Sequence, residues 1–280
     1  MPARIITVAN QKGGVGKTTT TVSLGAELAS RCRVLLIDLD PKANATSSLG
    51  CTDPERERST YDVLLGHASL SEIILKTAIP NLDLAPADRL LAGAQIELVD
   101  FADRERRLER PIRALTDAAG HDAGYDLILI DTPPSLGLLT LNALAISDHV
   151  LIPVQSEYLA LEGLGQLVET LELVRGSLNP RLALIGIVLT MLDARTNLSV
   201  QVSNEVRKHF PAATFQTAIP RSIRLSEAPS YGRPITLYDP ASRGARAYAE
   251  LADEVAERLG LAGAAMPAGP PVNSNGTRRA

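Results

Sequence analysis

Short apolar runs alternate with helical patterns along most of the chain. Runs rich in Val, Ile and Leu predict buried strands, and segments with apolar residues every three or four positions predict helices. The predicted strands span Arg4–Ala9, Arg33–Asp38, Leu82–Pro86, Tyr125–Asp131, His149–Val154 and Leu182–Thr190. The predicted helices span Thr18–Ser30, Ala87–Asp100, Arg104–Ala118, Ala160–Arg175, Leu198–His209 and Ser242–Leu259.

This alternation predicts an α/β fold. Strands that are apolar on both faces and separated by helices are typical of a mostly parallel twisted sheet, covered by helices on both sides. Residues 1–260 contain no internal repeat or linker and are expected to form one domain. After Gly260 the composition changes to Ala, Gly, Pro and Asn, so residues 261–280 are predicted to be a disordered tail.

Composition limits the classes of protein that the chain can represent. Of its 280 residues, 45% are hydrophobic and only 3% aromatic, so an aliphatic core can form without disulfides. Cys32 and Cys51 lack metal-ligand spacing and are predicted to be unpaired thiols in a reducing cytosol. No apolar run reaches the roughly 18 residues of a membrane span, and Arg4 already begins a strand, which leaves no room for a signal peptide. We therefore expect a cytoplasmic protein.

A glycine-rich loop lies between the first predicted strand and the first predicted helix. It reads Lys12-Gly13-Gly14-Val15-Gly16-Lys17-Thr18-Thr19, with Gln11 where the usual P-loop has glycine. Glycines let backbone N–H groups turn toward an anion, and the helix that follows presents further unpaired N–H groups. Lys17 would reach the β and γ phosphates, and the Thr18 hydroxyl would bind Mg²⁺. The loop predicts a P-loop NTPase.

Acidic residues end two of the predicted strands. Asp131 closes one strand, where its carboxylate can hold a water on Mg²⁺. Asp38 and Asp40 end another, and alternate strand residues share a face. One of this pair can serve the metal shell while the other orients the attacking water. Either could instead only cap the loop that enters Pro41.

Four segments together resemble the ParA/MinD family of ATPases. Residues 10–19 look like the deviant Walker A box of that family, and Asp38-Leu39-Asp40-Pro41 look like its second box. Asp131-Thr132-Pro133-Pro134-Ser135 resemble its Walker B and switch region. Residues 219–230 resemble a segment of the chromosomal ParA (Soj) branch. The match keeps its order over residues 4–259.

The resemblance implies a mechanism that uses ATP and Mg²⁺. Lys12 would reach across a homodimer to the phosphates of the ATP in the other subunit, so that ATP holds the dimer together and hydrolysis releases it. Asp40 matches the residue that positions the hydrolytic water, and Asp38 is assigned with Thr18 and Asp131 to the metal. Pro220 and Ser222 match positions that line the base, although this branch often carries Asn at 222. Met191 is a further candidate by position.

The charge distribution and the same resemblance point to DNA. Between Arg195 and Arg246 the net charge is +5, whereas the whole chain carries −4. Such asymmetry is what a local phosphate-binding surface on an acidic protein would show. Arg195 and Arg224 match DNA-contacting arginines of the family, although solvated helix charges and structural ion pairs are the plainer interpretation of such residues. No helix-turn-helix precedes Arg4, so the expected partners are non-specific DNA on the nucleoid and a ParB-like centromere-binding protein.

Two other classes of function stay open as alternatives to DNA partitioning. A MinD-like membrane-cycling ATPase would need a C-terminal amphipathic helix, which residues 266–271 with three prolines cannot form. A P-loop small-molecule kinase, or a reductase with a cluster between subunits, could use the same fold. The cysteines do not suit a cluster, and the segment Ser226–Ser230 together with the basic stretch argues against the kinase.

Overall fold

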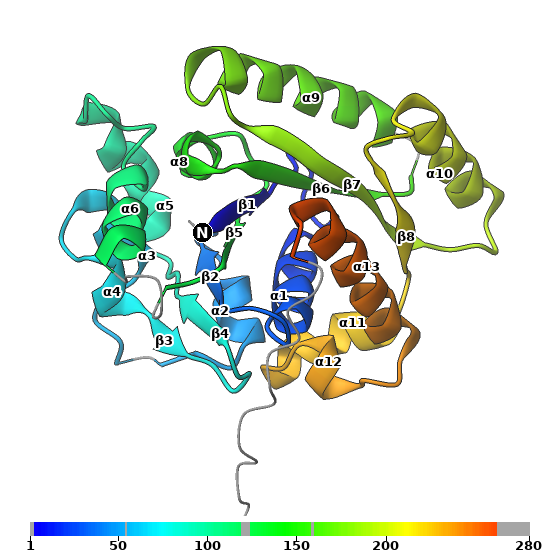
Figure 1. Ribbon diagram of the computed structural model, residues 1–280, viewed down its shortest axis with the longest axis horizontal. Coiled ribbons are helices and arrows are strands. Elements are labelled where there is room, and N and C mark those ends of the chain that lie inside the picture. The colour runs from blue at the N-terminus through cyan, green and yellow to red at the C-terminus, as the bar shows by residue number, and fades with distance from the viewer. Residues whose placement is uncertain (1–2, 54, 119–123, 158–159, 262–280) are drawn as a thin grey trace, which may run out of the picture.

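The computed structural model describes residues 3–53, 55–118, 124–157 and 160–261. These residues form an eight-stranded sheet in the order β3-β4-β2-β5-β1-β6-β7-β8 (Figure 1). Neighbouring strands run parallel except for the pair β3 and β4. The strands are β1 Arg4–Val8, β2 Val34–Asp38, β3 Leu75–Lys76, β4 Leu82–Ala85, β5 Leu127–Asp131, β6 His149–Gln155, β7 Ala183–Leu192 and β8 Thr214–Pro220. The predicted α/β fold with a mostly parallel sheet is confirmed.

Helices cover both faces of the sheet (Figure 1). On one face lie α1 Lys17–Leu28, α2 Asn44–Ser48, α11 Ile223–Glu227, η2 Ala228–Tyr231, α12 Ile235–Tyr238 and α13 Arg243–Leu259. The other helices are α3 Thr60–Leu65, α4 Leu70–Ile73, α5 Leu91–Glu97, η1 Leu98–Asp100, α6 Glu109–Ala118, α8 Leu138–Ile146, α9 Ala160–Ser177 and α10 Asn197–His209. No described helix is long and apolar enough to cross a bilayer.

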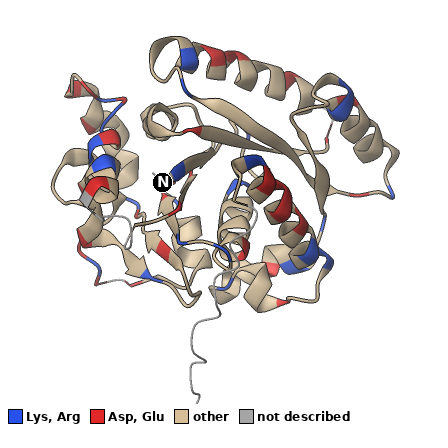
Figure 2. Ribbon diagram, in the orientation of Figure 1, with Lys and Arg blue, Asp and Glu red and all other residues tan. Residues whose placement is uncertain are grey.

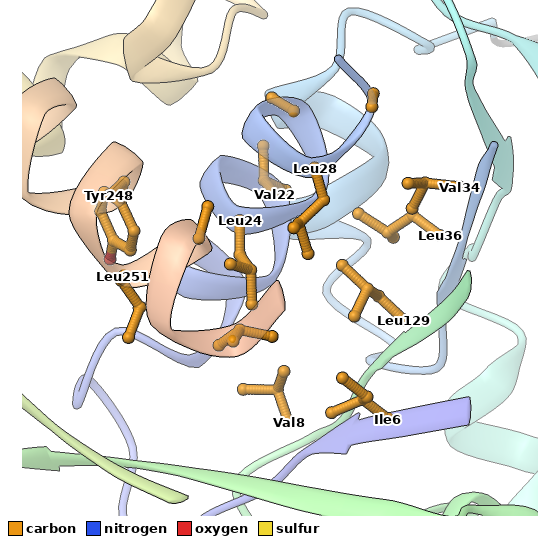
Figure 3. Close-up of a cluster of buried hydrophobic side chains, with 14 of the residues drawn as sticks. Ile6, Val8, Val22, Leu24, Leu28, Val34, Leu36, Leu129, Tyr248 and Leu251 are labelled. Carbon is orange, nitrogen blue, oxygen red and sulfur yellow. The ribbon is translucent and has the colours of Figure 1, made fainter. Parts of the chain in front are cut away.

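The central strands divide their side chains between two cores because successive residues point to opposite faces. Ile6 and Val8 of β1 pack against α1 and α13 (Figure 3). Leu36 of β2 and Leu129 of β5 join them, while Ile128, next in sequence, belongs to the core on the opposite face with α3, α5 and α8. β2 and β5 are thus buried on both faces, and each has an acidic residue, Asp38 or Asp131, at its carboxyl end.

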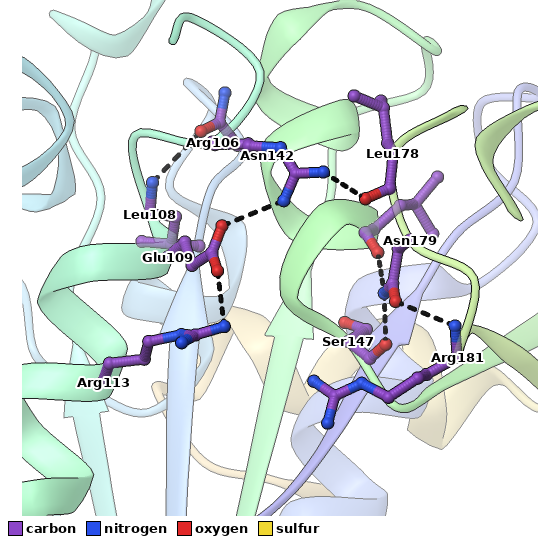
Figure 4. A network of polar contacts seen from close by, with 10 residues as sticks. Arg106, Leu108, Glu109, Arg113, Asn142, Ser147, Leu178, Asn179 and Arg181 are labelled. Atoms are coloured by element: carbon purple, nitrogen blue, oxygen red, sulfur yellow. Dashed lines mark hydrogen bonds and ion pairs between the residues drawn. The ribbon is translucent and has the colours of Figure 1, made fainter. Parts of the chain in front are cut away.

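Two asparagine side chains fix α8 to the surrounding loops (Figure 4). Asn142 donates to the carbonyls of Arg104 (2.7 Å) and Leu138 (2.8 Å) and accepts from Leu108 N–H (3.1 Å). Asn179 donates to the Leu144 and Ser147 carbonyls at 2.9 and 2.7 Å. Each side chain satisfies buried backbone groups that no regular element pairs.

Several predicted boundaries differ from the structure. The helix expected from Arg104 begins at Glu109, and Asn142 explains this because it bonds backbone groups of Arg104 and Leu108 that a continuous helix would have used itself. The helix predicted over residues 87–100 is α5 followed by the 3-10 turn η1. The sequence patterns predict neither the edge strands β3 and β8 nor the short helices α2, α3, α4, α8, α11 and α12. The predicted disordered tail lies outside the described residues from 262 onward.

Candidate functional site

The glycine-rich loop joins β1 to α1 as predicted. Gly14 and Gly16 have φ angles of 77° and 87°, a left-handed conformation that side chains disfavour. Gly16 offers no side-chain cap to α1, so the N–H groups of the first helical turn stay available to an anion. The Asn10 side chain donates to the Pro153 carbonyl at 2.7 Å, and the Thr190 hydroxyl donates to the Val15 carbonyl at 2.8 Å. These two hydrogen bonds attach the loop to β6 and β7.

The two lysines of the loop have different environments. Lys17 is only 7% exposed and donates to the Lys12 carbonyl at 3.0 Å. Burial lowers the pKa of Lys17, and the nearby carboxylates of Asp131 and Asp40 oppose that effect. The side chain of Lys12 is 45% exposed and forms an ion pair with Glu157. Lys17 thus lies inside the site, while Lys12 lies on its rim.

Asp131 and Asp38 lie side by side because β5 and β2 pair in register at these two residues. Both carboxylates are fully buried, and Asp131 accepts a hydrogen bond from Thr18 at 2.7 Å. Burial raises the pKa of Asp131, and the Asp38 carboxylate raises it further. Buried carboxylates that repel one another form a site that a cation would stabilise.

Asp38 holds the segment that follows β2. Its Oδ2 accepts from the backbone N–H of Thr46 (2.9 Å) and from the Thr46 hydroxyl (2.8 Å), and its Oδ1 accepts from Asp40 N–H at 3.1 Å. Asp40, 5% exposed, accepts from Lys42 N–H at 3.0 Å. In this geometry Asp38 positions Asp40 and α2. Its contacts agree with the alternative that it caps the loop entering Pro41. Its assignment to the metal stays a prediction.

The donor set fits Mg²⁺ held together with a phosphate rather than a metal held by protein alone. Among the described residues, no group of three or more His, Cys, Asp and Glu side chains could hold a metal ion. Mg²⁺ commonly keeps several waters and takes one or two protein oxygens plus phosphate oxygens. The Thr18 hydroxyl and the Asp131 carboxylate, 2.7 Å apart, supply such oxygens beside the loop.

A cleft of about 640 Å³ extends from the loop toward β7 and β8. Gly16, Thr18 and Thr19 line one end, and Met191, Pro220 and Ser222 line the other. Met191 has a φ of 52°, so the chain turns sharply where β7 ends. Three of the residues predicted for phosphate therefore line the same cleft as the residues predicted for the base, and the roles of both groups stay predictions.

The two arginines predicted to contact DNA lie beyond the base end of this cleft. The Arg195 side chain is 87% exposed and forms two hydrogen bonds, at 2.8 and 2.9 Å, with Asp193, which lines the cleft. Arg224 bonds Glu227 at 3.0 Å and lies 3.4 Å from Asp239. The exposed pair of Arg224 with Glu227 contributes little to stability, so this guanidinium can exchange partners, whereas Arg195 is held by two bonds to one carboxylate.

Sequence reasoning missed three residues of the site. Glu157 pairs with Lys12, Thr46 bonds Asp38, and Thr21 bonds Asp131. Only Thr21 had a signal in the sequence, since it follows Thr18 by three positions and such residues share a helix face. The other two are brought to the site by the folding of the loops after β6 and β2.

Comparisons with known proteins extend over nearly the whole chain. The sequence matches the AAA domain family over residues 3–184. It is 56% identical over 254 residues to the sporulation initiation inhibitor protein Soj of Bacillus subtilis, covering 90% of this chain and 98% of that protein. It is 49% identical over 259 residues to the chromosome partitioning protein ParA of Caulobacter vibrioides, covering 92% of this chain and 95% of that one.

A solved structure adds a bound nucleotide to the comparison. Cobyrinic acid a,c-diamide synthase from Mycobacterium smegmatis, with bound ADP and magnesium, matches with a TM-score of 0.78 and 38% identity. The match covers 96% of this chain and 100% of that one. A nucleotide with magnesium in that protein agrees with the ATP and Mg²⁺ expected here from the loop sequence.

Proposed function

This chain belongs to the ParA/Soj family of chromosome-partitioning ATPases, and from that premise we propose that it segregates DNA through an ATP-driven cycle of dimerisation. In this cycle two ATP-bound chains form a sandwich dimer that binds DNA of any sequence. A ParB-like centromere-binding protein stimulates hydrolysis, which separates the chains and releases the DNA. The protein acts in the cytoplasm, associated with the nucleoid.

The placement of Lys12 is the observation that carries the proposal. Its ammonium group pairs with Glu157 on the rim of the cleft, whereas Lys17 occupies the interior beside Asp131 and Asp40. A lysine on the rim can turn outward to a second chain without leaving its own loop. Two facing triphosphates would repel strongly, and a cation from each side offsets that charge.

The phosphate end of the cleft supports hydrolysis by ATP and Mg²⁺. Lys17 and the N–H groups of the loop would hold the β and γ phosphates, and Thr18 and Asp131 would hold the metal, Asp131 through a water. Mg²⁺ would neutralise charge that develops on the transferred phosphoryl group. Asp40, fixed by its contacts with Asp38 and Lys42, would orient the attacking water.

The surface between α10 and α13 supports binding to DNA. In the coloured ribbon of Figure 2, basic residues lie near the end of α10 and at the start of α13, while acidic residues lie along α9 and in the middle of α13. Arg195 and Arg224 are exposed; Arg195 pairs with Asp193 at the edge of the cleft, and Arg224 pairs with Glu227 on the surface. Phosphates of DNA can replace those partners, and contacts to phosphate carry no sequence information. The surface suits DNA of any sequence.

The comparisons favour partitioning over a metabolic role. The solved relative named as a synthase is 38% identical, whereas the Soj and ParA relatives are 56% and 49% identical over a similar share of this chain. The basic surface beyond the cleft also has no use in a small-molecule kinase.

DNA binding measured with three nucleotide states tests the proposal. Fluorescent duplexes of two unrelated sequences should bind with a non-hydrolysable ATP analogue, and not with ADP or without nucleotide. Affinity should fall steeply with salt for both sequences alike. Equal binding in ADP, or discrimination between the sequences, would contradict the proposed cycle.

Arg224→Glu sharpens this test. The variant should lose DNA binding while keeping its affinity for the ATP analogue, because Arg224 lies outside the nucleotide cleft. Arg175→Glu is the matched control, since Arg175 pairs with Glu172 on α9 at the same three-residue spacing as Arg224 with Glu227. If Arg224→Glu binds DNA as tightly as Arg175→Glu, the surface is assigned wrongly.

A further inference from the structure

Two threonines of α1 hold the two carboxylate oxygens of Asp131. Thr18 donates to Oδ2 at 2.7 Å, and the Thr21 hydroxyl contacts Oδ1 at 3.1 Å and the Lys17 carbonyl at 3.0 Å. Residues three apart on a helix lie on one face, so both hydroxyls point from α1 toward the end of β5. The carboxylate is thereby held from two sides.

The two threonines differ in their access to the cleft. Thr18 lines it, whereas Thr21 is completely buried and is absent from its lining. The Thr21 hydroxyl instead contacts two groups of the site, the Asp131 carboxylate and the Lys17 carbonyl. Whatever it contributes must pass through Asp131 or through the loop carbonyl of Lys17.

Thr21 is the partner of Asp131 that lies away from the cleft. If Thr18 gives its hydroxyl oxygen to Mg²⁺, its hydrogen bond to Asp131 would weaken, and Thr21 would be the hydroxyl that still holds the carboxylate. A buried carboxylate with fewer hydrogen bonds is freer to rotate. The contact of Thr21 with Oδ1 opposes such a rotation and keeps Oδ2 facing Thr18.

We propose that Thr21 is a positioning residue for Mg²⁺, which fixes the Asp131 carboxylate through Oδ1 so that Oδ2 can hold the water shell of the metal. The inference rests on the proposed assignment of Thr18 and Asp131 to Mg²⁺. Hydrogen-bond partners of metal-holding carboxylates commonly raise metal affinity about 10- to 100-fold. The same effect is expected here from a residue outside the cleft.

Mg²⁺ titrations of nucleotide binding test the inference. A fluorescent ATP analogue is bound to the full chain at increasing Mg²⁺, and the Mg²⁺ midpoint is measured. Thr21→Val should raise the midpoint about 10-fold or more, while nucleotide binding without Mg²⁺ stays the same. Thr21→Ser keeps the hydroxyl and should restore the wild-type midpoint.

Thr20→Val is the matched control. Thr20 is equally buried on α1, but its hydroxyl contacts Tyr248 at 3.1 Å and not Asp131. A purely structural loss would affect thermal unfolding in both variants without moving the Mg²⁺ midpoint. Should Thr21→Val fail to fold, Thr21→Ala, which introduces no larger group, carries the same expectation.

The outcomes separate this inference from the proposed function. A wild-type chain whose nucleotide binding ignores Mg²⁺, or a Thr18→Ala variant with an unchanged midpoint, would overturn the metal assignment itself. A wild-type midpoint in Thr21→Val and Thr21→Ala, with Thr18→Ala shifted, would overturn only the role of Thr21. Failure of Thr21→Ser to restore the midpoint would do the same.

Discussion

The two ends of the nucleotide cleft are built in different ways. At the phosphate end, β1, β2 and β5 pair in continuous register, and Asp38 and Asp131 at their ends are fully buried. At the base end, β7 pairs with the edge strand β8 with two register shifts, and Met191, Arg221 and Arg224 are exposed. The first end is fixed by strands buried on both faces, and the second by loops at the edge of the sheet.

This difference indicates a division of tasks. Phosphate chemistry needs charged groups held closely in place, which buried strand ends and short hydrogen bonds provide. A surface that takes and releases DNA needs exposed cations whose present partners exchange readily, as surface ion pairs do. The exposed base end adjoins Arg195 and Arg224, so the proposed nucleotide and DNA sites lie at one cleft.

Two glycines form a close contact between the segment at the phosphate end of the cleft and the segment at its base end. Gly50 follows α2, and Gly232 follows η2, with φ angles of 71° and 62°. A Cβ atom on Gly232 would lie 2.9 Å from the Gly50 Cα atom, closer than side chains pack. The segment after Asp38 and Asp40 therefore touches the segment after Arg224 backbone to backbone.

Lys12→Ala should give the largest effect, because it removes the cation that is proposed to hold the dimer together at the phosphate end of the cleft. In an Asp40→Ala background that slows hydrolysis, ATP should drive dimerisation, and adding Lys12→Ala should weaken the dimer by about 2–5 kcal/mol, as for removal of one member of a buried charge pair. Light scattering across a concentration series measures this. Lys76→Ala, at the far edge strand, serves as the control, and a Lys12→Ala dimer of unchanged affinity would contradict the sandwich.

Gly232→Ala tests the contact between the ends. A left-handed φ and the short approach to Gly50 should destabilise the fold by about 1–3 kcal/mol in urea unfolding. Gly163→Ala is the matched control, because Gly163 lies in α9 with open space around it. That variant should gain about 0.5–1 kcal/mol from a better helix former. Equal stability of the two variants would show that the glycine contact is loose.

Ser222→Ala should give the smallest effect and probes the base end. A single neutral hydrogen bond is worth about 0.5–1.5 kcal/mol, so ATP affinity should fall by no more than roughly tenfold. Calorimetric titration of ATP measures the change, and Ser226→Ala, also on the cleft lining, is the control. If Ser222→Ala costs as much free energy of ATP binding as Lys12→Ala costs in dimerisation, the base end is held as firmly as the phosphate end.

Local patterns predicted the phosphate end well. The loop at residues 12–19 and the acidic strand ends lie where the sequence placed them, because a buried strand has a strong apolar signal and its neighbours in sequence follow it directly. The base end was harder. In β8 the polar residues Gln216 and Thr217 interrupt the apolar residues, so no continuous apolar run marks the strand, and α8 is so evenly apolar that it lacks a helical period.

By itself, the sequence determined six of the eight strands, all except the edge strands β3 and β8, together with the glycine-rich loop between β1 and α1, since each of these has a local pattern of its own. Only the tertiary structure decided that Thr21 meets Asp131 and that Glu157 holds Lys12. Thr21 and Asp131 are 110 positions apart. Contacts across such distances depend on strand order and packing, which no local pattern records.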